Sequence, residues 1–336
     1  MLKIKNKFDF IFHQDLKNIK VVVGDCKYIG LELKKENFHN INGPNIKRVI
    51  FTDGGNAELF NNNSLSVQKL RVYSSVYENK KRLQSFREDL DAIAYTSIRN
   101  GEIIYTLETE PNKINLSLDS NDSSIRKGMN RAQISSMFDV ARRFLEIKQS
   151  SDMCRKFHNS LIVLDGTLKP NYPGEKEILN ELYKTAEEND CFVCAVAKTN
   201  NLITNKSLPV NYVLEKIAPF EKWYYYPIMQ NKNSNHKAEI IMAKLNKSSK
   251  FIFRIEIAKH NMNNIGTIIA TLKEFSSDFS FPGYPYGLID ADRFARISND
   301  EKNILRLRFL HKLNKEVVNS ENNTTAHDIL NRIINR

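Results

Sequence analysis

The chain has 336 residues, 41% of them hydrophobic, and its 50 lysines and arginines exceed its 39 aspartates and glutamates by 11. The hydrophobic content, with only 12 glycines and 9 prolines, excludes a disordered or collagen-like chain, and the length fits one large domain or two ordinary ones. The sequence has no apolar run of the roughly 18 residues that a membrane span requires, no secretory signal and no disulfide framework. We therefore expect a soluble intracellular protein.

Strand and helix patterns alternate along the chain. Residues 48–52 are a short β-rich run that ends at Asp53, and residues 66–77 suit a long strand. Apolar residues recur at three- and four-residue steps over 131–147, which predicts a helix. These three segments open the predicted fold.

The second half of the chain continues the alternation. The predicted elements are a buried strand over 160–164 that ends at Asp165, a helix over 174–188, a buried strand over 191–197 that ends at Lys198, a hairpin over 236–245 and 250–257, and helices after Gly283. Strands and helices thus interleave with hairpins. This order predicts an α/β fold with a mixed sheet.

The excess positive charge is concentrated in part of the chain. Between residues 122 and 156, eight basic residues face four acidic ones. The eight are Arg126, Lys127, Arg131, Arg142, Arg143, Lys148, Arg155 and Lys156. Clustered basic side chains favour a nucleic acid over a neutral metabolite, although an anionic membrane surface also fits the charge.

Polar residues follow three of the predicted strands. Asp53, Asp165 and Lys198 each come directly after an apolar run. If these strands are neighbours, the three side chains meet at one sheet edge, where α/β proteins bind ligands. Two carboxylates at one place repel each other unless a cation such as Mg²⁺ or Mn²⁺ lies between them. Each Asp also precedes a glycine, so an ordinary Asp-Gly turn explains either residue equally well.

Two further acidic positions have a functional and a plain interpretation. Glu146 falls on the polar face of the predicted helix, where it either pairs with Arg142 or reaches the Asp165 edge. Asp290, Asp292 and Arg293 fall in the expected first turn of a late helix, where an acid is also favoured by the helix dipole.

Several enzyme classes are disfavoured by missing motifs. The sequence contains no phosphate-binding Gly-x-x-x-x-Gly-Lys loop, no His-Glu-x-x-His metal motif and no Gly-x-Ser-x-Gly nucleophile elbow. Cys191 and Cys194 have the spacing of a zinc or redox pair, but they lie in an apolar strand without a second pair. We therefore interpret both as core cysteines.

In this setting the sequence resembles the NurA family of DNA nucleases. The resemblance covers about residues 48–298 and rests on five motifs in order. These are Asp53-Gly, a helix carrying Glu146, Leu164-Asp165-Gly-Thr-Leu168, Val196-Ala-Lys198-Thr, and Gly283-Tyr-Pro-Tyr-Gly-Leu-Ile-Asp-Ala-Asp292-Arg. Asp292 stands where family members often have His, which leaves Asp290 as an alternative. The first motif reads Asp-Gly-Gly instead of the more usual Asp-Gly-Ser.

The resemblance implies a fold, an activity and partners. It implies a mixed sheet with a ribonuclease H-like core, and a homodimer that cleaves DNA with Mn²⁺, or alternatively Mg²⁺. It also implies work beside a HerA-type hexameric ATPase in DNA end processing for double-strand break repair, in the cytoplasm at the nucleoid. We expect an N-terminal strand and loop extension over 1–47, the nuclease domain over 48–298 and a C-terminal helical segment over 299–336.

The resemblance also implies site residues. Asp53, Glu146 and Asp165 match the acidic metal-binding positions, and Lys198 matches the basic one. In a two-metal mechanism we expect Asp53 to bridge the ions, Asp165 and Asp292 to complete one site and Glu146 the other. We expect Lys198, Arg142, Arg143 and Arg293 to contact the DNA backbone.

Two alternatives remain beside the DNA nuclease. One is a catalytically inactive nucleic-acid-binding subunit with the same fold. The other is a nuclease that acts on RNA or RNA–DNA hybrids, because acidic metal sites do not by themselves distinguish these substrates.

Overall fold

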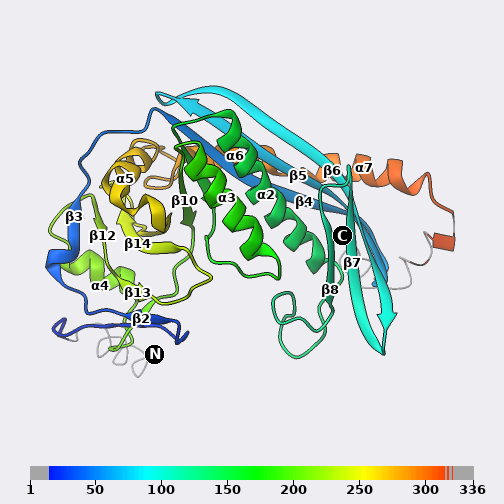
Figure 1. Cartoon of the computed structure of the whole chain (residues 1–336), viewed down its shortest axis with the longest axis horizontal. Coiled ribbons are helices and arrows are strands. Elements are labelled where there is room, and N and C mark those ends of the chain that lie inside the picture. Colours follow the sequence, from blue (N-terminus) through cyan, green and yellow to red (C-terminus); the bar gives the residue numbers. More distant parts are fainter. Residues whose placement is uncertain (1–14, 315, 318–319, 321–336) are drawn as a thin grey trace, which may run out of the picture.

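One mixed β-sheet organises the chain in the computed structural model, which describes residues 15–314, 316–317 and 320 (Figure 1). Within these residues the sheet has 11 strands. In spatial order they are β3 (Phe38–Asn40), β12 (Trp223–Tyr225), β14 (Ala238–Lys244), β15 (Phe253–Ala258), β10 (Phe192–Ala197), β9 (Ser160–Asp165), β4 (Arg48–Asn61), β5 (Leu65–Glu78), β6 (Lys81–Arg99), β7 (Glu102–Glu110) and β8 (Asn115–Asp119). The expected α/β class with a ribonuclease H-like core is confirmed.

The centre of the sheet is parallel and its two sides are antiparallel. Strands β4, β9 and β10 run in the same direction, whereas every other pair in this sheet is antiparallel. The parallel strands are almost continuous apolar runs, as expected where helices cover both faces. The carboxyl ends of β9 and β10 therefore lie at one sheet edge, beside the point where β4 continues past Thr52.

Helices cover both faces of this centre. On one face, α2 (Ser136–Lys156) and α3 (Glu175–Glu188) pack on a core that includes Ile50, Ile162 and Val193. On the other face lie α5 (Ile265–Glu274) and α6 (Tyr286–Ala295), against a core that includes Phe51 and Val163. Figure 1 shows α2 and α3 side by side in front of the sheet.

The long antiparallel strands extend as a ribbon away from the helical centre. Strands β4 to β7 form this part, and helix α7 (Asn299–Leu310) lies along β4 (Figure 1). A buried arginine fixes α7 there: Arg71 of β5 is ion-paired with Asp89 of β6 at 2.7 Å and with Glu301 of α7 at 2.5 Å. The expected C-terminal helical segment thus begins as a helix at 299, while its residues 321–336 lie outside the described part.

The chain before β4 packs on the opposite end of the sheet. It contains β1 (Val21–Val22), β2 (Tyr28–Gly30) and a short 3-10 helix (Lys35–Asn37), and residues 1–14 lie outside the described part. Strand β1 pairs with β11 (Ile203–Thr204) and β2 with β13 (Met229–Asn231). With α4 (Val210–Ile217), these elements enclose a core around Trp223. A second 3-10 helix (Lys259–Asn264) leads into α5.

Three sequence expectations about elements are wrong. The strand expected to end before Asp53 continues to Asn61, because both following glycines stay extended and pair with β5. The helix expected over 131–147 is α2, which begins at Ser136 and ends at Lys156. Its last turns carry buried serines: Ser150 and Ser151 donate hydrogen bonds to the carbonyl groups four residues earlier, so a polar-looking stretch remains helical.

The third correction concerns α6. The helix begins at Tyr286, directly after Pro285, so Asp290, Asp292 and Arg293 lie in its middle and last turns. A favourable interaction of these acids with the N-terminal end of the helix dipole is therefore excluded as the reason for their positions. Among the described residues, no helix is both long and apolar enough to span a membrane.

We predict that the Arg71 cluster contributes to acid-dependent stability. Burial opposes ionisation of Asp89, but hydrogen bonds from Arg71 and Arg87 lower the pKa of this carboxyl to about 2. A folded-state pKa below the unfolded value of 3.8 stabilises the fold above about pH 4, and this contribution disappears as the pH falls towards 2. Asp89→Asn is expected to lower the free energy of unfolding by about 2 kcal/mol at pH 7 and by much less near pH 2, measured by urea denaturation.

Asp91→Asn is the matched control for this prediction. Asp91 lies on the same strand, is 63% exposed and forms a surface ion pair with Lys69. Such pairs contribute about 0–1 kcal/mol. Equal losses of stability for the two variants, or a loss in Asp89→Asn that does not depend on pH, would contradict the prediction.

Candidate active site

The strand register places Asp53 beside Asp165. Strand β4 pairs in parallel with β9 up to Thr52 and Leu164, so the next residue on each strand is one of the two aspartates. Neighbouring strands lie about 4.8 Å apart, and paired residues face the same side of the sheet. Strand β9 ends at Asp165 while β4 continues, which leaves one side of β4 open beyond Asp53. Both aspartates therefore lie at an open sheet edge.

Asp165 is held by two neighbours that occupy its two oxygens. The ammonium group of Lys198 donates to Oδ2 at 2.8 Å, and the hydroxyl group of Tyr284 donates to Oδ1 at 3.1 Å. Tyr284 is 1% exposed, and burial together with the negative charge of Asp165 raises the pKa of its hydroxyl group. Lys198 Nζ also lies 3.7 Å from Asp292 Oδ1 on α6. Lys198 thus connects Asp165 to Asp292.

Glu146 reaches the same place from the opposite face of the sheet. Its helix α2 crosses β4 at Gly54, where no side chain intervenes. A Cβ atom built on Gly54 would lie 2.7 Å from Glu146 Oε1 and 2.8 Å from Cγ of Arg142. Glu146 is only 7% exposed, so it is not the solvated surface acid that an i,i+4 pair with Arg142 would make it. Its ion-pair partner is Arg143, at 3.6 Å.

Burial and neighbouring acids disfavour ionisation of Asp53 and Glu146. Burial raises the pKa of Asp53 to about 8, and the negative charges of Glu146 and Asp165 add to the effect. Burial likewise raises the pKa of Glu146, although Arg143 and Arg142 oppose the shift. A site that concentrates buried negative charge in this way stabilises a bound cation.

A pocket of about 320 Å³ gives access to these carboxylates. Its walls come from β4, α2 and the loop that follows Asp165. The lining residues are Asp53, Asp139, Arg142, Arg143, Glu146, Asp165, Gly166, Thr167, Asn171 and Tyr172. Asp292 and Lys198 lie beyond Asp165, outside this lining.

Arg143 connects several parts of the pocket wall through its guanidinium group. Its side chain is 14% exposed, and its guanidinium donates to Glu175 Oε1 at 2.9 Å and to the carbonyl oxygen of Thr167 at 2.5 Å, in addition to its ion pair with Glu146. Glu175 is fully buried and accepts two further hydrogen bonds, from the backbone amides of Asn171 and Tyr172. The pair therefore joins Glu146 to the pocket loop.

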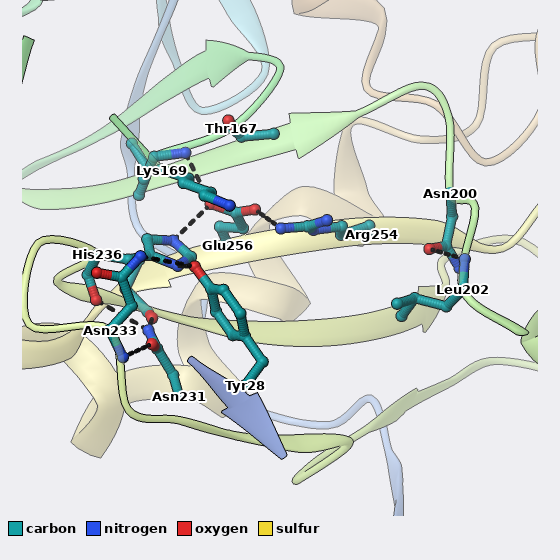
Figure 2. Close-up of polar contacts among 12 residues, drawn as sticks. Tyr28, Thr167, Lys169, Asn200, Leu202, Asn231, Asn233, His236, Arg254 and Glu256 are labelled. Atoms are coloured by element: carbon teal, nitrogen blue, oxygen red, sulfur yellow. Dashed lines mark hydrogen bonds and ion pairs between the residues drawn. The ribbon is translucent and has the colours of Figure 1, made fainter. Parts of the chain in front are cut away.

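A second buried carboxylate holds the other side of this loop (Figure 2). Glu256 accepts a hydrogen bond from the backbone amide of Leu168 at 2.7 Å and another from the His236 ring at 2.9 Å, and it is ion-paired with Arg254. Although burial opposes ionisation, these partners lower the pKa of Glu256. His236 in turn lies 2.9 Å from the Tyr28 hydroxyl group, so the network links β2 to the loop.

Two further expected residues, both on α6, make other contacts. Asp290 accepts a hydrogen bond from Tyr77 at 2.9 Å and is ion-paired with Arg82, so this carboxylate is engaged away from Asp165. Arg293 is exposed, and its guanidinium lies 5.8 Å from the ring of Phe294. The geometry therefore favours Asp292 over Asp290 as the acidic residue of α6 at the site.

The donor set fits a hard divalent cation, and the side chains still have to close around it. Carboxylate oxygens are the ligands that Mg²⁺ and Mn²⁺ prefer. Within residues 15–314, 316–317 and 320, however, no three His, Cys, Asp or Glu side chains are already arranged to hold a metal ion. The site therefore has the chemistry for a metal ion, and its carboxylates would have to move closer to bind one.

The sequence patterns missed two groups in this site. Tyr284 lies within the quoted Gly283-Tyr-Pro-Tyr motif and could have been singled out as a buried donor for Asp165. Glu175 has no such signal, because an acid in the first turn of a helix is ordinary. The departure from Asp-Gly-Ser also acquires a reason: a Cβ atom on Gly55 would lie 2.3 Å from the carbonyl oxygen of Ala295, so this glycine lets α6 lie against β4.

Comparison with known proteins identifies the family. The sequence matches the NurA domain over residues 47–297. The chain belongs to the NurA family. This membership supports a nuclease activity. No curated protein matches the sequence.

One solved structure shows the same fold. The NurA nuclease from Sulfolobus solfataricus has a TM-score of 0.53 and 13% identity, and the match covers 92% of each chain. The catalytic domain of human endonuclease V has a TM-score of 0.37 and 11% identity, covering 79% of this chain and 84% of that one. Ciona intestinalis endonuclease V in complex with a 23mer DNA has a TM-score of 0.38 and 10% identity, covering 77% and 86%. Only the first of these likenesses bears on the fold.

We predict that Gly54→Ala impairs nuclease activity by displacing Glu146. The new methyl group would lie too close to the Glu146 carboxylate and to Arg142, so at least one of them must move. We expect nuclease activity to fall by about tenfold or more, because displacements of about 1 Å in an active site have costs of this size. A crystal structure of the variant would show the carboxylate shifted away from Asp53.

Gly24→Ala provides the matched control. A Cβ atom on Gly24 meets nothing within 4 Å, so this substitution should leave activity unchanged. Full activity in Gly54→Ala, with Glu146 in its original position, would contradict the prediction.

Proposed function

We propose that the chain is a Mn²⁺- or Mg²⁺-dependent deoxyribonuclease that processes DNA ends for double-strand break repair. The observation that carries this proposal is the convergence of Asp53, Glu146 and Asp165 from three elements on one open sheet edge in a NurA-family chain. Family membership further supports a homodimer that works with a HerA-type hexameric ATPase in the cytoplasm at the nucleoid. We also propose that the chain consists of an N-terminal extension over 1–47, the nuclease domain over 48–298 and a C-terminal helical segment over 299–336.

Each residue of the site has a distinct role in the proposed reaction. Asp53, Glu146 and Asp165 would hold the metal, with Asp292 close by through Lys198. When bound, a divalent cation supplies an activated water molecule and neutralises charge on the leaving oxygen. Tyr284 fixes the orientation of Asp165. Lys198, which is 44% exposed, can turn its ammonium group towards a phosphate.

The arginines divide into two groups. Arg142 and Arg293 are accessible, and we propose that they contact phosphates along the bound strand together with Lys198. Arg143 was expected to do the same, but its three internal contacts suit it better to hold Glu146 and the pocket loop in position. Its contribution to DNA binding would then be indirect.

We predict that Asp53→Asn abolishes metal-dependent cleavage. The amide has the shape of the acid but lacks the negative charge that a metal ligand needs, so turnover should fall by at least about 10³-fold while DNA binding and folding persist. The assay compares single-stranded DNA, duplex DNA and RNA–DNA hybrid with Mn²⁺, Mg²⁺ or EDTA. Asp91→Asn, on β6, serves as the control substitution and should retain full activity.

This assay also decides between the proposal and its two alternatives. Binding without cleavage of any substrate by the wild-type chain would identify an inactive binding subunit. Preferential cleavage of RNA or of the hybrid would identify the other nuclease class. Wild-type cleavage by Asp53→Asn would refute the site assignment.

We predict that Arg293→Gln reduces the salt dependence of DNA binding. When one phosphate contact is lost, DNA binding releases fewer counterions. The slope of log K against log salt concentration should therefore decrease in magnitude by about 0.7–0.9. Fluorescence anisotropy over a salt series measures this slope. Arg155→Gln is the control, because Arg155 lies at the end of α2 in surface ion pairs with Asp152 and Glu181. An unchanged slope for Arg293→Gln would remove this residue from the DNA-binding surface.

A further inference from the structure

A surface beside the active site combines exposed aromatic rings with lysines. Strand β10 pairs with β15 through Ala197 and Arg254, so the turn between β14 and β15 lies at the sheet edge that carries Asp165 and Lys198. The segment after α5 packs on this turn: Asn246 donates a hydrogen bond to the carbonyl oxygen of Ser276 at 3.0 Å. Two chain segments thus form the rim of the site at this point.

Aromatic rings connect this rim to the catalytic carboxylate. Phe251 of the turn is 53% exposed, and its ring centroid lies 5.3 Å from that of Phe281. The Phe281 ring stacks on Tyr284 at 5.3 Å and 29°. Tyr284 in turn donates its hydrogen bond to Asp165. Phe251 is therefore connected through Phe281 to Tyr284, which donates a hydrogen bond to the proposed metal ligand.

The charge around Phe251 is positive. Lys247 and Lys250 are exposed in the same turn, and Lys198 lies over the Tyr284 ring, 5.7 Å from its centroid. Asp278 is a partly exposed acid in the segment after α5, and the same segment exposes Phe279 fully. Exposed phenyl rings flanked by lysines suit a ligand that is both aromatic and anionic. A single-stranded nucleic acid has this chemistry, because its bases stack on aromatic rings while lysines contact its phosphates.

We propose that Phe251 forms a base-binding subsite that stacks on an unpaired base of the strand being cleaved. This inference rests on the proposed nuclease function and names the feature of the substrate that the rim recognises. A base in a duplex is covered on both faces by its neighbours, so it cannot stack on Phe251 without first leaving the helix. The subsite therefore selects strands with unpaired bases next to the phosphate that is cleaved.

The test measures binding separately from cleavage. A short fluorescein-labelled oligothymidylate and a blunt duplex of equal length are titrated with the full chain in EDTA, and fluorescence anisotropy gives the two affinities. Phe251→Ala is expected to weaken binding of the single strand by about 5-fold to 100-fold, with little change for the duplex, because stacking on one aromatic side chain is worth about 1–3 kcal/mol per base. Phe251→Trp, which keeps an aromatic face, should bind like the wild type.

Ile98→Ala is the matched control. Ile98 is 76% exposed on β6 near its turn to β7, so the variant also removes an exposed apolar side chain, but away from the active site. Unchanged single-strand affinity in Phe251→Ala would overturn the subsite, and so would an equal loss for the duplex or a change of oligomeric state. Cleavage by wild type with Mn²⁺, assayed in parallel, tests the proposed function independently. A wild-type chain that cleaves while Phe251→Ala binds normally would refute the subsite alone.

Discussion

The repulsion between buried carboxylates is the constraint on which the rest of the structure depends. Asp53 and Asp165 are neighbours across two parallel strands, and Glu146 approaches them from a helix on the other face. Burying acids together is unfavourable, which is why the pKa values of Asp53 and Glu146 are raised. Surrounding residues must hold the carboxylates in such an arrangement. A bound cation would relieve the repulsion between them.

The scaffold around the carboxylates consists of buried charged groups with complementary partners. Arg143 and Glu175 compensate each other's charge while they hold the pocket loop, and Glu256 does the same with Arg254 and His236 on the other side. Burying one of these charged groups without a partner is energetically unfavourable. Removing one partner therefore leaves the other with its full desolvation penalty. The loop after Asp165 is thus fixed by interactions that neither metal nor DNA needs to supply.

Glycines determine how closely the helices approach the sheet. Gly54 lets α2 bring Glu146 to the edge, and Gly55 lets α6 lie on the other face of the same strand. Adjacent residues of a strand point to opposite faces, so two consecutive glycines leave both faces of β4 without a side chain at this point. The Asp-Gly-Gly sequence therefore places α2 and α6, which carry Glu146 and Asp292, around one aspartate.

The amino-acid sequence by itself determined the α/β class, the central strands and the family, because apolar runs that end in Asp165 or Lys198 are local patterns. It also pointed to Asp53, Glu146 and Asp165 through an ordered set of motifs. Local patterns do not report distances between remote segments. Only the tertiary structure showed that Glu146 is buried, that Arg143 points inward, that Asp290 is engaged elsewhere and that Tyr284 holds Asp165. These depend on strand register and helix packing, which join residues up to 213 positions apart.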